Sequence, residues 1–76
     1  MELKKGRYQH FKGKFYNVLG VARDCEDPKK LFVVYQALYD SAEFGKNQIW
    51  IRPLDDFLGE KELENGKKVP RFKFVD

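Results

Sequence analysis

His10 is the only histidine in this sequence and the side chain best suited to move a proton near neutral pH. A general base also needs a second group that orients it and a pocket that holds a substrate. The neighbouring residues Tyr8, Gln9 and Phe11 provide no such arrangement. We therefore interpret His10 as a hydrogen-bonded residue of a strand, and an enzyme that uses His10 ranks third among the functions we consider.

Cys25 is the only cysteine, and carboxylates surround it in the segment Asp24-Cys25-Glu26-Asp27. Negative neighbours disfavour the thiolate that nucleophilic catalysis requires, so Cys25 is better explained as a tolerated loop residue. One histidine and one cysteine also provide fewer than the three or four ligands that zinc takes from a protein. The sequence therefore predicts no catalytic residue, no metal site and no cofactor.

Asp55 and Asp56 are adjacent carboxylates that follow Pro53. On one helical turn, neighbouring residues point in different directions, so these two groups cannot converge as an acid–base pair. Acidic residues are favourable in the first turn of a helix, and proline is well tolerated at its first position. We expect both aspartates to have a structural role.

A set of aromatic and cationic side chains is the stronger candidate for a functional site. Along the segment 48–52, Trp50 shares a strand face with Arg52, opposite Ile49 and Ile51. If the two isoleucines face the core, Trp50 faces outward beside a cation, as in surfaces that bind nucleic-acid bases, proline-rich peptides or a protein partner. The alternative is that Trp50 packs on the second face of the sheet, under the apolar stem of Arg52. The predicted binding residues are Trp50, Arg52, Tyr35, Tyr39, His10 and Tyr8.

The net charge of +3 conceals two basic ends around an acidic middle. Residues 1–14 carry five Lys or Arg against one acid, residues 15–66 carry six against ten, and residues 67–76 carry four against one. Because the ends of compact domains are often close together, the two basic segments could form one positive face. Ordinary solubilising charge is the simpler interpretation, and we prefer it on this pattern alone.

Length and composition predict one small domain. At 76 residues the chain fits a single domain over residues 7–76, after a flexible lead-in at residues 1–6. Seven Phe, four Tyr and one Trp offer large rings that can fill a small core. Charged residues make up 36% of the chain, and no apolar run has the length of a membrane span or signal peptide. We expect a cytoplasmic protein with no membrane contact.

Six short segments rich in aromatic and β-branched residues predict strands. They are Arg7–Phe11, Lys14–Asp24, Leu31–Tyr39, Gln48–Arg52, Glu60–Glu64 and Lys67–Val75. No segment between them is long enough for the crossover helix that a parallel βαβ unit requires. The expected fold class is all-β, a small and partly open barrel of five or six short antiparallel strands.

Turn and breaker residues divide these strands. Gly20 predicts a bulge or bend within the longest strand, and Asn65-Gly66 predicts a tight hairpin turn. A polar loop is expected over residues 40–47. After Pro53, the spacing of apolar residues at 54, 57 and 58 predicts one short helical turn near residues 53–58 that plugs the barrel.

Five segments stand in a characteristic order along nearly the whole chain: Tyr8–Gly13, Tyr16–Ala22, Val33–Tyr39, Trp50–Phe57 and Asn65–Phe72. This order resembles the bacterial domain-of-unknown-function family 1653. The resemblance implies an SH3-like small barrel and no agreed activity. Two segments depart from the family pattern: Asp24-Cys25 replaces a stretch that often carries His and Ser, and the loop at residues 40–47 is longer than usual.

These observations favour a non-enzymatic binding module. Single-stranded nucleic acid is the first candidate ligand, because basic ends accompany the aromatic residues around Trp50 and Arg52. The alternative is a protein-interaction domain or a weak homo-oligomer, which the surplus of rings and an edge strand bearing Pro70 would favour.

Overall fold

The computed structural model describes residues 3–76, and most of its regular structure is β-strand. The elements are β1 (Gly6–His10), β2 (Phe15–Arg23), β3 (Leu31–Ala37), β4 (Asp40–Ser41), β5 (Gly45–Lys46), β6 (Ile49–Pro53), α1 (Leu54–Phe57), β7 (Glu60–Glu62), β8 (Lys68–Pro70) and β9 (Phe72–Phe74). Five strands form one antiparallel sheet in the order β6-β3-β2-β1-β9, while β4 pairs with β5 and β7 with β8. The expected all-β class with one short helical turn is confirmed.

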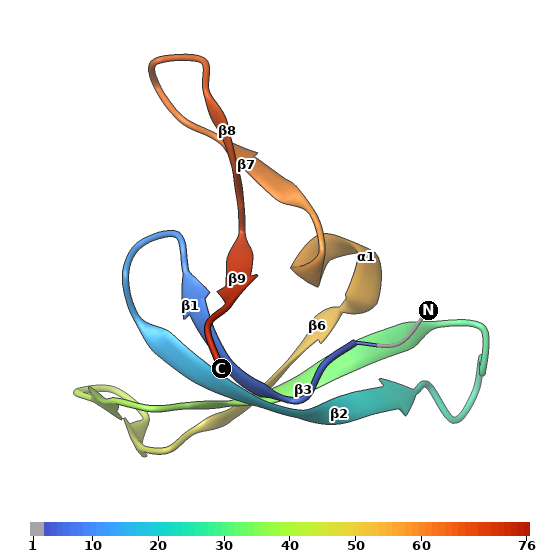
Figure 1. Cartoon of the computed structure of the whole chain (residues 1–76). Helices are drawn as coiled ribbons and strands as arrows, with labels where there is room; N and C mark the ends of the chain where they lie inside the picture. Colours follow the sequence, from blue (N-terminus) through green and yellow to red (C-terminus); the bar gives the residue numbers. More distant parts are fainter. Residues whose placement is uncertain (1–2) are drawn as a thin grey trace.

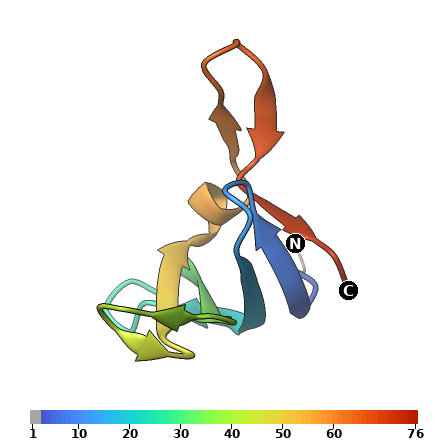
Figure 2. The same ribbon diagram turned by 90° about the vertical axis from the view of Figure 1, so that its left-hand side faces the viewer.

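The five-stranded sheet is curved, and α1 lies over its concave side (Figure 1). The strands β6 and β9 are its two edges, and within residues 3–76 no pairing joins them, so the sheet is not closed into a barrel. The β7–β8 hairpin projects away from the sheet in both views (Figures 1 and 2). Across residues 3–76, no helix has the length and apolar content of a membrane span.

The core lies on the concave side of the sheet. Its buried residues are Tyr8, Val18, Val33, Tyr35, Phe57 and Phe72. Phe57 of α1 is 1% exposed and stacks on Phe72 of β9, with ring centroids 4.1 Å apart. Leu54 packs partly against this core, but Leu58 is 42% exposed. The helical turn therefore plugs the sheet as expected, although the prediction that Leu58 shares its buried face is wrong.

The faces of β6 are the reverse of the expected ones. Ile49 and Ile51 are 52% and 63% exposed, whereas Trp50 is partly buried and packs against the core. The reason is the register with β3, in which Trp50 pairs with the buried Tyr35. Cross-strand partners point to the same side of a sheet, so Trp50 must share the concave side. The prediction of an outward indole opposite two core isoleucines is wrong.

Two local glycine signals are confirmed. The β2–β3 register shifts between Val18 and Gly20, as expected for a bulge in the longest strand. At the tip of the β7–β8 hairpin, Gly66 has a φ of 83°, a conformation that glycine adopts without steric penalty. The side chain of Asn65 accepts a hydrogen bond from the backbone of Lys67 at 3.0 Å and so closes the turn.

The last expected strand, over residues 67–75, is divided in two. Its first part, β8, pairs with β7, and its second part, β9, pairs with β1 in the main sheet. Arg71 lies at the junction, where its N–H donates to the carbonyl of Gly59 at 3.0 Å. Its own carbonyl accepts from the N–H of Phe11 at 3.0 Å, which ties the junction to the end of β1. One sequence segment therefore serves two sheets.

The two basic ends of the chain lie side by side. His10 of β1 pairs with Phe72 of β9, and Arg7 forms an exposed ion pair with Asp76 at 2.9 Å. Strand β1 begins at Gly6, inside the expected lead-in, and Leu3 packs against the core. Residues 1–2 of that lead-in lie outside the described residues. The two basic segments, which the charge pattern alone left as ordinary solubilising charge, are therefore neighbours in the sheet.

Candidate ligand-binding site

Eight aromatic and charged residues from five strands, α1 and the neighbouring connections converge on the concave side of the sheet. Their contacts join the end of β1, the start of β2, β3, β6 and the β8–β9 junction. We define the arginine–tyrosine cluster as His10, Tyr16, Tyr35, Tyr39, Arg52, Asp56, Arg71 and Phe72. The sheet topology brings these residues together although they are spread from position 10 to position 72.

Phe72 lies at the centre of the cluster. It is 7% exposed, and the ring centroids of His10, Tyr16 and Tyr35 lie 4.9, 5.7 and 5.5 Å from its own. The three contacts are close to edge-on, which suits the charge distribution of aromatic rings. The guanidinium carbon of Arg52 lies 5.5 Å from the Phe72 centroid. The buried ring of Phe72 therefore packs beneath the polar ends of the residues around it.

Arg52 is held by two side-chain partners. Its Nε–H donates to the hydroxyl of Tyr35 at 3.3 Å, and its terminal nitrogen donates to Asp56 at 2.8 Å. Burial lowers the pKa of Arg52, but the hydrogen bonds to Tyr35 and Asp56 outweigh it and raise the pKa overall. The guanidinium is fixed and fully charged.

Arg71 contrasts with Arg52 because its guanidinium is less well partnered. The side chain is only 22% exposed, and its Nε is buried without a hydrogen-bond partner. Its closest charged contact is a terminal nitrogen 3.8 Å from Asp56, which is too long for a hydrogen bond. Within residues 3–76 we find no hydrogen bond from this guanidinium. The mostly buried guanidinium of Arg71 therefore has N–H groups that form no hydrogen bond within the described residues.

Tyr16 and Tyr39 form a hydroxyl pair whose oxygen atoms lie 2.9 Å apart. Burial is the main cause that raises the pKa of Tyr16, and the hydrogen bond with Tyr39 adds to it. Tyr16 therefore stays protonated at physiological pH. Lys14 lies over the ring of Tyr39, with its Nζ 4.5 Å from the centroid. The pair can donate one further hydroxyl hydrogen, since only one of the two is used between the rings.

His10 has one ring nitrogen engaged. Its Nδ1 accepts a hydrogen bond from the backbone N–H of Lys12 at 3.2 Å, so the neutral ring carries its proton on Nε2. Burial lowers the pKa of His10, and the positive charges of Arg52, Lys12 and Arg71 lower it further. At neutral pH the imidazole is therefore uncharged, and its Nε2–H is a donor.

The cluster as a whole is rich in hydrogen-bond donors and poor in acceptors. Two guanidinium groups face one carboxylate, Asp56, and the imidazole and tyrosine hydroxyls add further donors. Such a set fits a ligand that carries oxyanions, above all phosphate or carboxylate. Among the described residues, no group of three or more His, Cys, Asp or Glu is arranged to hold a metal ion.

Four of the six predicted binding residues belong to the cluster, namely His10, Tyr35, Tyr39 and Arg52. Tyr8 does not, because it is 5% exposed in the core and its hydroxyl donates to the carbonyl of Lys4. Tyr8 is therefore a core residue and not the surface binding residue that the sequence predicted.

Trp50 also lies outside the cluster. Its ring meets Phe44 of the β4–β5 hairpin edge-on, with centroids 5.1 Å apart. Phe44 comes from the segment expected as a polar loop, which instead forms a short hairpin. The indole is thus part of the packing between this hairpin and β6, on the same side of the sheet as the core and not on its second face.

Sequence reasoning missed Arg71 and Phe72 as cluster members, and it gave Asp56 only a helix-terminus role. Tyr16 was part of the aromatic–cationic set but not one of the six predicted binding residues. The available signal was the run of Phe72 and Phe74 on one strand face, which indicated a buried ring but not its polar neighbours. Arg71 had no signal, because its position follows from the division of one segment between two sheets.

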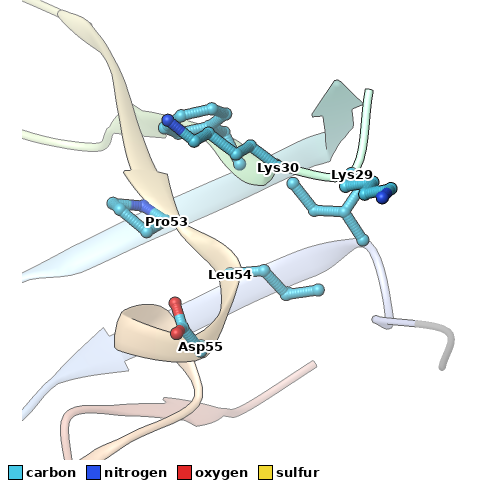
Figure 3. Close-up of a pocket in the computed structure, with 7 residues that line it drawn as sticks. Lys29, Lys30, Pro53, Leu54 and Asp55 are labelled. Atoms are coloured by element: carbon cyan, nitrogen blue, oxygen red, sulfur yellow. The ribbon is translucent and has the colours of Figure 1, made fainter. Parts of the chain in front are cut away.

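A separate pocket of about 580 Å³ lies between α1 and the turn that joins β2 to β3 (Figure 3). It is lined by Lys29, Lys30, Leu31, Phe32, Pro53, Leu54 and Asp55. The figure shows Lys29 and Lys30 extending in different directions, with Leu54 between Asp55 and the lysines. None of the predicted binding residues lines this pocket.

His10 also lines a second pocket, of about 380 Å³, beside the β7–β8 hairpin. The other lining residues are Gln9, Phe11, Leu63, Val69, Pro70 and Lys73. The set contains no carboxylate that could act as the partner of a catalytic histidine. The pocket therefore gives the enzyme hypothesis little support.

Comparison with known proteins places the chain among proteins whose function is unassigned. A family model described as "Protein of unknown function (DUF1653)" matches residues 6–74. A crystal structure of a DUF1653 protein from Bordetella bronchiseptica is similar, with a TM-score of 0.81 and 34% sequence identity. The match covers 96% of this chain and 87% of that one. None of the curated proteins matches this chain.

Proposed function

The chain belongs to the DUF1653 family, and we propose that it is a non-enzymatic, cytoplasmic binding module for single-stranded nucleic acid. The observation that carries this proposal is the arginine–tyrosine cluster, a donor-rich surface with aromatic rings and one carboxylate. Phosphate groups need cationic donors, and unpaired bases need rings on which to stack. The cluster offers cationic donors and the partly exposed rings of His10, Tyr16 and Tyr39, while Tyr35 and Phe72 are buried beneath them.

The basic N-terminal segment adds further cation–ring pairs, although Arg7 and Phe15 lie on the face of the sheet opposite the cluster, since they alternate with the concave Tyr8 and Tyr16. Four cations from residues 4–14 lie over aromatic rings: Lys4 over Phe74, Arg7 over Phe15, Lys12 over Phe11 and Lys14 over Tyr39. The centroid distances range from 4.5 to 5.9 Å. Alternating rings and cations are typical of surfaces that follow a single strand without reading its sequence. This pattern supports single-stranded over double-stranded nucleic acid.

The proposal is tested by the salt dependence of binding to a fluorescent single-stranded oligonucleotide. Each phosphate contact should contribute about −0.7 to the slope of log affinity against log salt. We expect Lys14→Gln, beside Tyr39, to weaken binding and to reduce the slope by about 0.7. Lys30→Gln makes the same charge change at the far end of β2, where Arg23 pairs with Leu31, and should leave binding unchanged.

Two results would reject nucleic-acid binding. One is no detectable binding at micromolar protein in low salt. The other is an affinity that does not change between about 50 mM and about 200 mM salt, because counterion release would then contribute nothing. Equal effects of Lys14→Gln and Lys30→Gln would instead indicate general attraction to a positive protein, not a site.

A second candidate is self-association through β6, and it rests on a different observation. Ile49 and Ile51 are 52% and 63% exposed on the outer face of an edge strand, and Val34 is the cross-strand neighbour of Ile51. Exposed apolar residues on an unpaired edge favour strand addition from another copy. Sedimentation should then show a dimer that Ile51→Lys dissociates. A strict monomer at high concentration would exclude this function.

A further inference from the structure

We infer that Arg71 is the principal phosphate-binding residue of the cluster, and that Arg52 and His10 complete one oxyanion subsite with it. This inference rests on the proposed function, since it names the group of the ligand that the cluster holds. Its chemistry is that of a phosphate monoanion or dianion, whether free or within a nucleic-acid backbone.

The first reason is the unmet bonding of the Arg71 guanidinium. Its side chain is 22% exposed, its Nε is buried without a partner, and Asp56 lies 3.8 Å away. Asp56 instead gives its short contact, 2.8 Å, to Arg52. A buried cation without hydrogen bonds is costly, so folded proteins usually supply a partner. The Nε itself is closed to solvent, but the terminal nitrogens of the same guanidinium are not among the buried atoms, so a bound oxyanion would be their partner.

The second reason is that the backbone of Arg71 is fixed on both sides. Its N–H is bonded to the carbonyl of Gly59 after α1, and its carbonyl to the N–H of Phe11 after β1. The guanidinium therefore starts from a defined point between the helical turn and the β1–β2 turn. A fork of donors held in this way matches two oxygens of a phosphate.

The third reason is that neighbouring donors are available. Arg52 uses Nε and one terminal nitrogen, which leaves its other terminal nitrogen free. His10 uses Nδ1 as an acceptor, which leaves Nε2–H as a donor. His10 and Arg52 lie 4.9 and 5.5 Å from the centroid of Phe72, and Arg52 and Arg71 both approach Asp56, so the three groups are neighbours.

The test follows the arginine Nε–H signals in proton–nitrogen correlation spectra during titration with inorganic phosphate. A parallel titration with chloride at matched ionic strength corrects for screening. We expect the Arg71 Nε–H signal to shift in a saturable way with phosphate only, and a smaller shift at Arg52. Arg23, an exposed arginine that donates to the carbonyl of Pro28, is the internal control and should not respond.

Substitutions separate charge from the fork geometry. Arg71→Lys keeps the charge but loses bidentate donation, and we expect about tenfold weaker phosphate binding, equivalent to about 1.4 kcal/mol. Arg71→Gln should abolish saturable binding, and Arg23→Gln should bind as the parent. Thermal unfolding of each variant establishes that it is folded. If Arg71→Gln does not fold, the titration of the parent protein decides by itself.

An Arg71 signal that is unmoved by phosphate, or an Arg71→Lys variant that binds like the parent, would overturn the inference. Different results would reject the proposed nucleic-acid function and the proposed phosphate subsite. Phosphate binding at Arg71 without any oligonucleotide binding would keep the subsite and reject nucleic acid, leaving free phosphate as its ligand. Oligonucleotide binding with no response at Arg71 would keep the function and reject the subsite.

Discussion

The hydroxyl oxygens of Tyr16 and Tyr39 lie 2.9 Å apart and join the start of β2 to the residue that precedes β4. Burial, first among the causes, raises the pKa of Tyr16, so this hydrogen bond persists across the physiological pH range. The pair closes one side of the arginine–tyrosine cluster.

Removing one hydroxyl from this pair should cost stability. We expect Tyr39→Phe to lower the free energy of unfolding by about 1 kcal/mol, the usual net value of one hydrogen bond. Urea unfolding measures the change, and Tyr16→Phe with the double variant completes a cycle. The loss in the double variant should be smaller than the sum of the two single losses. Additive losses would mean that the two hydroxyls do not interact in solution.

The burial of Trp50 can be observed directly because it is the only tryptophan. We expect native fluorescence at shorter wavelength than that of the unfolded chain, since the ring packs on the core and against Phe44 at 5.1 Å. Phe44→Ala should shift the emission to longer wavelength and lower stability by about 1 kcal/mol. Native emission like that of a fully exposed indole would support the outward orientation that the sequence suggested.

The titration of His10 should make stability depend on pH. Its folded pKa is lowered by burial and by the charges of Arg52, Lys12 and Arg71, while Tyr16 lies against its ring without a charge. The unfolded chain therefore binds the proton more readily below its own pKa of about 6.5. We expect stability to fall as pH drops below about 6.5 and to level off below the folded pKa.

The matched variant His10→Gln isolates this contribution. Its free energy of unfolding should change less than that of the parent between neutral pH and the lower limit of the window. Denaturant unfolding at several pH values measures both curves. Parallel curves for parent and variant would show that the lowered pKa of His10 does not occur in solution.

Gly6 is placed where a side chain would meet the opposite end of the chain. Its φ is 135°, and a Cβ there would lie 2.5 Å from the carbonyl oxygen of Asp76. Gly13 also has a positive φ, 107°, but nothing lies within 4 Å of its Cβ position. We expect Gly6→Ala to lower stability by about 1 kcal/mol more than Gly13→Ala, since both share the backbone strain. Equal losses in urea unfolding would show that the β1–C-terminus contact is absent.

The features that the sequence predicted are those set by local chemistry. Gly20 at a bulge and Asn65-Gly66 at a hairpin tip depend on the backbone freedom of the residues themselves. The helical turn after Pro53 likewise depends on its own spacing of apolar residues. These local features form regardless of which distant residues pack against them.

The features that the sequence did not predict depend on distant partners. The alternation in residues 48–52 offers two apolar faces, and only the register of β6 with β3 decides that Trp50 shares the side of Tyr35. Arg71 lies in the cluster because it joins β8 of the small sheet to β9 of the main sheet. Its backbone is held by Gly59, after α1, and Phe11, after β1, and both are distant from it in sequence. Four predicted residues still belong to the cluster because aromatic and cationic side chains gather around one buried ring.

The most direct test of the arginine–tyrosine cluster is a map of backbone amide shifts during titration with a single-stranded oligonucleotide in low salt. We expect the largest changes at His10, Tyr16, Tyr39 and Arg71, and unchanged signals around the pocket of Figure 3, including Lys30. Changes confined to that pocket or to the outer face of β6, or no changes at all, would contradict a nucleic-acid site at this cluster.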